Sequence, residues 1–214
     1  GSMRFRGSDG GWTTGSTRKG NVPLLDEFID ESIRRARIVA QSKNPELPEA
    51  ELAEVARVVG IGAIKYNDLC RDRLSDVHFD LDLALSLDGN TAPYMQYAYA
   101  RCCAIFRREN IDPARFRTDP PAVILGEPAE RALALQLLRF PEAVEAAAAD
   151  YLPHLVTGYL WDLAKAYSVF FENCPVLKAE TEPLRNSRLL LCDLTARTLA
   201  RGLNLLGIDV VERM

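Results

Sequence analysis

The sequence predicts an all-α protein, and two observations indicate this fold class. From Leu24 onward, apolar residues recur with the helical period in one segment after another. A proline stands near the start of four of these segments, where its missing N–H costs little: Pro128, Pro141, Pro153 and Pro183. We therefore expect a helical bundle preceded by a flexible N-terminal segment.

The first half of the chain supplies two helices and a short extended stretch. Residues 4–21 are rich in Gly, Ser and Thr and show neither helical nor strand period, which predicts a loop or a mobile tail. Residues 24–41 carry acidic residues early, basic residues late and one apolar stripe, as an amphipathic helix does: Leu25, Phe28, Ile29, Ile33 and Ala36. Residues 49–71 predict a second helix. The alternation at 77–83 predicts a short strand before an Asp-Gly turn.

The second half is helical in pattern almost throughout. Residues 93–108 predict a third helix, and a proline-rich connector follows at residues 112–121. The remaining expected helices cover residues 127–140, 141–151, 152–174 and 182–207. The sequence contains no internal repeat of fixed period.

Composition limits the kinds of protein this chain can be. It has 214 residues, enough for one large domain or for a compact domain with an appendage. Hydrophobic residues make up 48%, yet no apolar run is long enough to span a bilayer, so no membrane partner is expected. A net charge of −4 argues against a general nucleic-acid coat, because non-specific binding draws on many cations. One local basic face is still compatible with this charge.

The cysteines and histidines do not form a metal or catalytic pattern. The five cysteines are odd in number and lack CxxC spacing, which favours a reducing cytoplasm over a disulfide framework. His78 and His154 stand far apart, and neither accompanies a nucleophile motif. Asp80 and Asp82 lack the glycine and the terminal glutamate of a calcium loop. We therefore predict no catalytic residue and no metal ligand in this chain.

The helix at residues 93–108, PYMQYAYARCCAIFRR, has two faces of different chemistry. At about 100° per residue, one arc of roughly 60° holds Tyr94, Tyr97, Arg101 and Arg108. The other side holds Met95, Tyr99, Cys102, Cys103 and Phe106, of which Met95, Tyr99, Cys102 and Phe106 are expected to be core. Tyrosines and arginines along one stripe are typical of surfaces that stack unpaired bases and hold phosphates.

A solvated face is the alternative interpretation of this stripe. Each tyrosine would then lay its ring on the edge of the core and point its hydroxyl outward. The pattern alone leaves both interpretations open.

Five stretches resemble the C-terminal part of arginyl-tRNA synthetase: IGAIKYNDLCRDR, SLDGNTAPYMQYAYARCCAIFRR, EPAERALALQLLRFPEAV, YLWDLAKAYSVFFENCPVL and LRNSRLLLCDLTARTLARGLNLLGIDVVERM. The resemblance is continuous from about residue 14 to residue 214. It implies an α-helical anticodon-binding domain of the DALR type over residues 22–214. It also implies that Tyr94 and Tyr97, in the PYxQY motif, and the C-terminal Met214 meet the anticodon loop. Backbone contacts from Arg101 and Arg108 are our inference from the helical geometry.

The segment GSTRKGNV resembles the K-M-S-x-S loop of the same enzymes. The resemblance implies that Ser16, Thr17, Arg18 and Lys19 are the remnant of a loop that lies over ATP and stabilises adenylation electrostatically. Thr14 and Gly15 replace the usual Lys and Met of that loop, so the point charge nearest the phosphates is missing. Residues 1–21 are thus expected to hold this remnant behind Gly1-Ser2, which is typical of a cloning scar.

The resemblance leaves three hypotheses about function. In the first, the chain is the tRNA(Arg)-binding part of arginyl-tRNA synthetase, and ATP-dependent arginylation with Mg²⁺ belongs to a Rossmann catalytic domain that the chain lacks. The chain would be a monomer, inactive alone, with no cofactor of its own, and its partners would be tRNA(Arg) and that catalytic domain. In the second, it is a freestanding paralogue that binds tRNA or protein. In the third, the stripe packs on another polypeptide.

Overall fold

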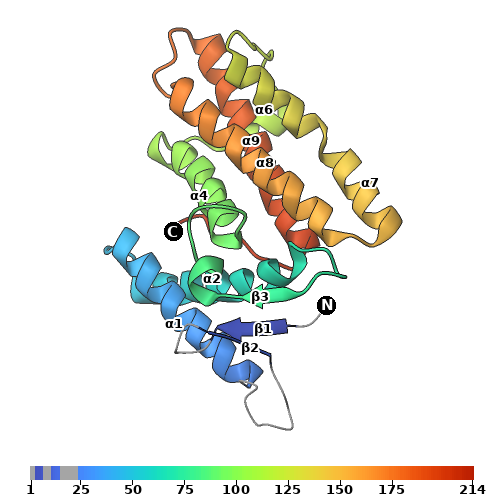
Figure 1. Ribbon diagram of the computed structural model, residues 1–214. Coiled ribbons are helices and arrows are strands. Elements are labelled where there is room, and N and C mark those ends of the chain that lie inside the picture. The colour runs from blue at the N-terminus through green and yellow to red at the C-terminus, as the bar shows by residue number, and fades with distance from the viewer. Residues whose placement is uncertain (1–2, 7–10, 15–23) are drawn as a thin grey trace.

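The structure, a computed structural model, describes residues 3–6, 11–14 and 24–214 (Figure 1). Helices dominate it, as the sequence predicted. The longer helices are α1 (Leu25–Lys43), α2 (Glu49–Leu69), α4 (Ala92–Arg108), α6 (Pro128–Leu138), α7 (Phe140–Asp150), α8 (Pro153–Asn173) and α9 (Glu182–Leu205). Two helices have a single turn, α3 (Leu81–Ala84) and α5 (Arg115–Thr118). Among the residues described, no helix combines the length and apolar character needed to cross a membrane.

The helices form two packed groups, with α4 between them (Figure 1). Helices α6, α7, α8 and α9 make the larger bundle, and α4 packs against α8 and α9. Helices α1 and α2 form an antiparallel pair beside three short strands. Helix α4 also contacts α2, and so, less extensively, does α8, so these two helices join the two groups.

The N-terminal strands correct one prediction. Where the sequence predicted a loop over residues 4–21, the structure has β1 (Met3–Arg6) and β2 (Trp12–Thr14). Strand β1 pairs antiparallel with β2 and parallel with β3 (Val77–Phe79). Strand β3 confirms the first part of the stretch predicted at residues 77–83, but its second part is wrong, because Asp80 caps the single-turn helix α3 there. Strands of three or four residues are too short to show a period. The second pairing partner of β1, β3, also lies far away in the sequence.

The larger core fills the space between α4, α6, α8 and α9. Its fully buried side chains include Met95, Leu133, Leu160, Tyr167 and Leu199. Burial of such apolar surface contributes roughly 25 cal/mol per Å², which makes this core the main source of stability for the bundle.

A smaller core lies between α1 and α2, and small residues allow the two helices to approach closely. A Cβ on Gly60 would lie 2.8 Å from the backbone of Ile33. The Ser32 hydroxyl donates a buried hydrogen bond of 2.9 Å to the Gly60 carbonyl. The buried line of α1 therefore runs through Ser32, Ala36 and Ala40, whereas Leu25, placed on the apolar stripe by the sequence, is 66% exposed.

Capping residues stabilise the starts of α4, α6 and α9, and the proline prediction is confirmed. Thr91 caps α4, since its hydroxyl accepts from the Tyr94 N–H at 3.3 Å. Thr181 caps α9 in the same way, and Glu127 with Glu130 forms a capping box at the start of α6. The four predicted prolines occupy the first or second positions of α6, α7, α8 and α9.

Candidate nucleic-acid interface

Helix α4 presents a buried face and an exposed face, as its sequence predicted. Met95 and Cys102 are fully buried and Phe106 nearly so, while Tyr99 is partly buried against the same core. The prediction of this face as core is therefore confirmed. Burial raises the pKa of the Cys102 and Cys103 thiols, so both stay protonated at neutral pH.

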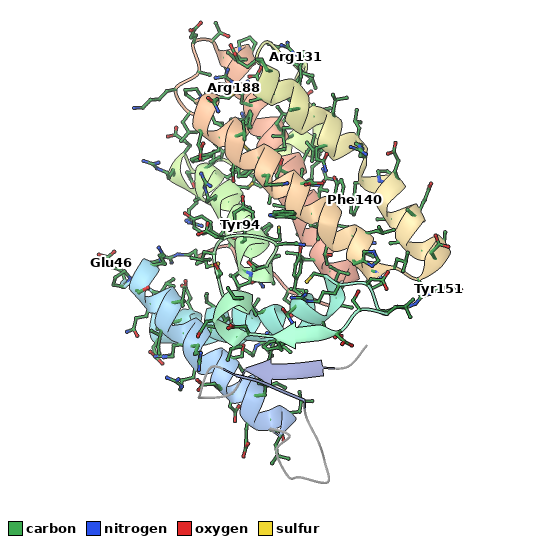
Figure 2. The ribbon with its side chains drawn as sticks, viewed as in Figure 1. Glu46, Tyr94, Arg131, Phe140, Tyr151 and Arg188 are labelled. Atoms are coloured by element: carbon green, nitrogen blue, oxygen red, sulfur yellow. The ribbon has the colours of Figure 1, made fainter. Side chains whose placement is uncertain are left out.

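The two tyrosines of the stripe have different surroundings. The ring of Tyr94 packs against the larger core, and its hydroxyl lies 3.2 Å from the Ser168 hydroxyl of α8 (Figure 2). Tyr97, one turn further along α4, is 38% exposed. Tyr94 therefore matches the alternative of a ring laid on the edge of the core, whereas Tyr97 offers part of its ring to a ligand.

Arg101 lies near two aromatic rings, one from each of two helices. Its guanidinium carbon is 5.6 Å from the centre of the Tyr97 ring and 4.1 Å from the centre of the Phe171 ring of α8. At these distances the ring electrons attract the cation and restrict its position. Phe171, 38% exposed, belongs to this cluster of side chains and was missed by the sequence analysis.

A pocket of 260 Å³ lies beside this cluster, between α4 and the turn that follows α8. Its lining combines apolar side chains with three cations: Arg101, Ala104, Ile105, Arg108, Phe171, Pro175, Val176, Leu177 and Lys178. Apolar walls suit the faces of a base, and the cations suit phosphate oxygens. The structure thus brings Tyr97, Arg101 and Arg108 together on one surface. We call Tyr97, Arg101, Arg108, Phe171 and the pocket the α4–α8 surface.

Met214 lies with the smaller core, whereas Tyr94 packs against the larger one. The segment that leads to Met214 is held in place at several points. The Lys65 ammonium donates to the Gly207 carbonyl at 2.6 Å, and the Gln96 amide donates to the Asp209 carbonyl at 2.9 Å. Arg213 pairs with Glu51 at 3.2 Å. Met214 is therefore a fixed terminus, and its contact with RNA stays a prediction.

The residues expected to contact ATP cannot be placed on this surface. Ser16, Thr17, Arg18 and Lys19 lie outside the described residues, which include Thr14 as the last residue of β2. Within residues 3–6, 11–14 and 24–214, no three His, Cys, Asp or Glu side chains gather as a metal site requires.

A helical bundle with exposed aromatic rings, cations and an apolar pocket on one face has the features of a protein that binds unpaired bases. Comparison with protein families agrees with this class. Residues 95–214 match the model of the DALR anticodon binding domain, and residues 6–81 match that of tRNA synthetases class I (R), catalytic domain. The chain belongs to the DALR anticodon binding domain family, which confirms the predicted family and fold class.

Similar proteins include arginine–tRNA ligases and solved arginyl-tRNA synthetases. The arginine–tRNA ligase of Proteus mirabilis is 50% identical over 198 residues, which are 92% of this chain and 34% of the relative. The arginyl-tRNA synthetase structure from Thermus thermophilus superposes with a TM-score of 0.86 at 37% identity, over 99% of this chain and 34% of that one. The structure from Plasmodium falciparum gives 0.78 at 31% identity, over 89% of this chain and 33% of that one. The chain therefore spans about a third of the length of these relatives.

Proposed function

We propose that the chain binds the anticodon loop of tRNA(Arg) and positions that tRNA for ATP-dependent arginylation by arginyl-tRNA synthetase. The family and the named relatives support the type of ligand. The α4–α8 surface supports the place of contact. We expect this to happen in a reducing cytoplasm, since the five cysteines are all free.

The observation that carries the proposal is the position of Arg101 between the rings of Tyr97 and Phe171, at the edge of the apolar pocket. Loop bases that are splayed out of a stack need aromatic or apolar surfaces to receive them. Tyr97 and Phe171 would provide ring surface for stacking. Arg101 would provide a cation for a base edge or for the adjacent phosphate, and the neighbouring pocket would enclose one base.

The other predicted residues would support this contact. Arg108, exposed and lining the same pocket, would bind a backbone phosphate. Tyr94 would hold α4 against α8 through Ser168 and offer only the edge of its ring. Met214 would contribute an apolar contact from the fixed C-terminal segment.

The activation chemistry would lie beyond this surface. ATP and Mg²⁺ would act at the catalytic domain, and Ser16, Thr17, Arg18 and Lys19 would approach the ATP phosphates. The match of residues 6–81 to the catalytic-domain model supports this assignment of the N-terminal part.

An equilibrium titration tests the proposal. The chain is titrated with a tRNA(Arg) transcript, an anticodon-swapped transcript and an unrelated tRNA, each at two salt concentrations. We expect preference for the arginine anticodon and loss of that preference in the Tyr94→Ala/Tyr97→Ala variant, provided the variant keeps its helical circular dichroism. Equal binding of all three RNAs, unchanged in the variant, would refute the role of the α4–α8 surface in reading the anticodon. It would favour the alternative of a module that binds another protein.

A further inference from the structure

A buried ion pair lies next to the pocket and joins three parts of the bundle. Arg188 of α9 donates through Nε to Glu130 of α6 at 2.7 Å. Through Nη1 it also donates to the Pro175 carbonyl at 2.9 Å. The Arg188 side chain is 8% exposed and that of Glu130 fully buried.

Glu130, one of the two partners of Arg188, is itself held in place. The second carboxylate oxygen of Glu130 accepts from the Glu127 N–H at 2.9 Å, in the capping box of α6. The position of Arg188 is therefore set by the start of α6 and by its own helix, α9. Its bond to Pro175, in contrast, reaches a turn that belongs to no helix.

That turn is one wall of the pocket. Pro175, Val176, Leu177 and Lys178 line the pocket opposite Arg101 and Arg108 of α4. The residue before the turn, Cys174, is fully buried, and burial raises the pKa of its thiol. A displacement of Pro175 would therefore change the shape of the pocket and expose Cys174.

We propose that Arg188 is a positioning residue for the pocket: held by Glu130, it fixes the turn at residues 175–178, so RNA binding depends on an ion pair that touches no RNA. This inference rests on the proposed function for its RNA part. The fork of the guanidinium is essential, because two donors must reach Glu130 and Pro175 at once, which the single ammonium of lysine does poorly.

Two variants separate this role from simple stability. Arg188→Lys keeps the positive charge beside Glu130 but loses the fork. The double variant Glu130→Gln/Arg188→Met removes both charges, so that no unpaired charge is buried, and the new glutamine side chain keeps an oxygen for the Glu127 N–H. If Arg188→Lys fails to fold, both readouts are taken from the double variant. Leu52→Ala, in the smaller core between α1 and α2, is the matched destabilised control.

The first readout needs no RNA. Each folded protein is treated with iodoacetamide, and the rate of alkylation at each cysteine is followed by mass spectrometry. We expect Cys174 to react roughly tenfold faster in either Arg188 variant, while Cys102 and Cys192, also fully buried, keep their rates. An equal increase in the alkylation rates of all three thiols would mean that the whole protein opens. An unchanged alkylation rate at Cys174 would mean that the turn keeps its position without Arg188. Either result would overturn the proposal.

The second readout is the affinity for an anticodon stem-loop of tRNA(Arg), measured well below the melting temperature. We expect roughly tenfold weaker binding in the Arg188 variants and unchanged binding in Leu52→Ala. If the wild-type protein binds the stem-loop without anticodon preference, the proposed function is refuted. The role of Arg188 in fixing the turn is then decided by the alkylation rates alone. Faster alkylation of Cys174 with unchanged affinity would overturn the positioning role.

Discussion

The guanidinium of Arg101 lies 4.1 Å from the centre of the Phe171 ring, and this contact joins α4 to α8 at the surface proposed to bind RNA. A cation held against a ring loses less freedom when it binds an anionic ligand than a freely moving arginine does. Phe171 is 38% exposed although Arg101 contacts its ring. Phe171 can therefore contact both Arg101 and a base.

Phe171→Ala should weaken binding of the tRNA(Arg) stem-loop by about 1–3 kcal/mol, the usual contribution of one base stacked on an aromatic ring. Phe171→Tyr should retain most of the affinity. Fluorescence anisotropy with a labelled stem-loop measures both. Leu138→Ala, which removes an exposed apolar side chain from α6, is the control and should bind like wild type. Equal losses in the alanine variants would remove Phe171 from the interface.

Arg108→Gln should reduce the dependence of affinity on salt. Each phosphate contact to a single-stranded region contributes about 0.7 to the slope of log affinity against log salt concentration, so one contact fewer lowers the slope by about that amount. Titrations at a series of salt concentrations measure the slope. Arg34→Gln removes an equal charge from α1, distant from the surface, and should leave the slope unchanged. A slope unaltered in Arg108→Gln would mean that Arg108 contacts no phosphate.

Gly60→Ala should destabilise the protein by about 1–3 kcal/mol, because its new methyl group would lie 2.8 Å from the backbone of Ile33 and force α1 away from α2. Gly158→Ala is the matched control. A Cβ at Gly158, within α8, meets nothing within 4 Å, so this change should stabilise by about 0.5–1 kcal/mol through helix propensity. Urea unfolding measures both, and opposite signs are expected. A neutral Gly60→Ala would show that the two helices can separate without cost.

Glu31 should titrate well below an ordinary glutamate. Hydrogen bonds from Arg34 and then Arg35 lower its pKa from 4.5 to about 2. Because the folded pKa is the lower one, the stabilisation from this cluster is complete above pH 4.5 and is lost as pH falls through about 2. Arg34→Gln should raise the pKa of Glu31 toward 4.5, as read from its carboxyl ¹³C shift, while Arg57→Gln should not change it. A Glu31 that titrates near 4.5 in the wild type would contradict the cluster.

The helices and their starts could be predicted because their signals are local. The period of the apolar residues and the prolines near the helix starts act within one or two turns, so the predicted bounds of α4, α8 and α9 lie close to those in the structure. Strands β1 and β2 could not be predicted, since they are too short to show a period and the second partner of β1, β3, lies far along the chain. Helix α5, a single turn inside the proline-rich connector, gave no periodic signal.

The candidate site was predictable only on one helix. The spacing of Tyr97, Arg101 and Arg108 placed them on one face of α4, and the structure brings them together there. Phe171 was missed because nothing in the sequence states that α8 packs beside that face. The partial burial of the Tyr94 side chain has the same cause: its neighbour Ser168 comes from α8. Tertiary packing, rather than local pattern, decided both.

The central claim is that an anticodon loop contacts the α4–α8 surface, and tyrosine ring NMR tests it most directly. The chain is prepared with ring-labelled tyrosine, and Tyr97 is assigned through a Tyr97→Phe variant. On addition of the tRNA(Arg) stem-loop, we predict that the Tyr97 signals shift while those of the buried Tyr66 and Tyr167 do not. An anticodon-swapped stem-loop should shift Tyr97 less at the same concentration. A Tyr97 signal that stays in place while the tRNA(Arg) stem-loop is shown to bind would contradict the claim.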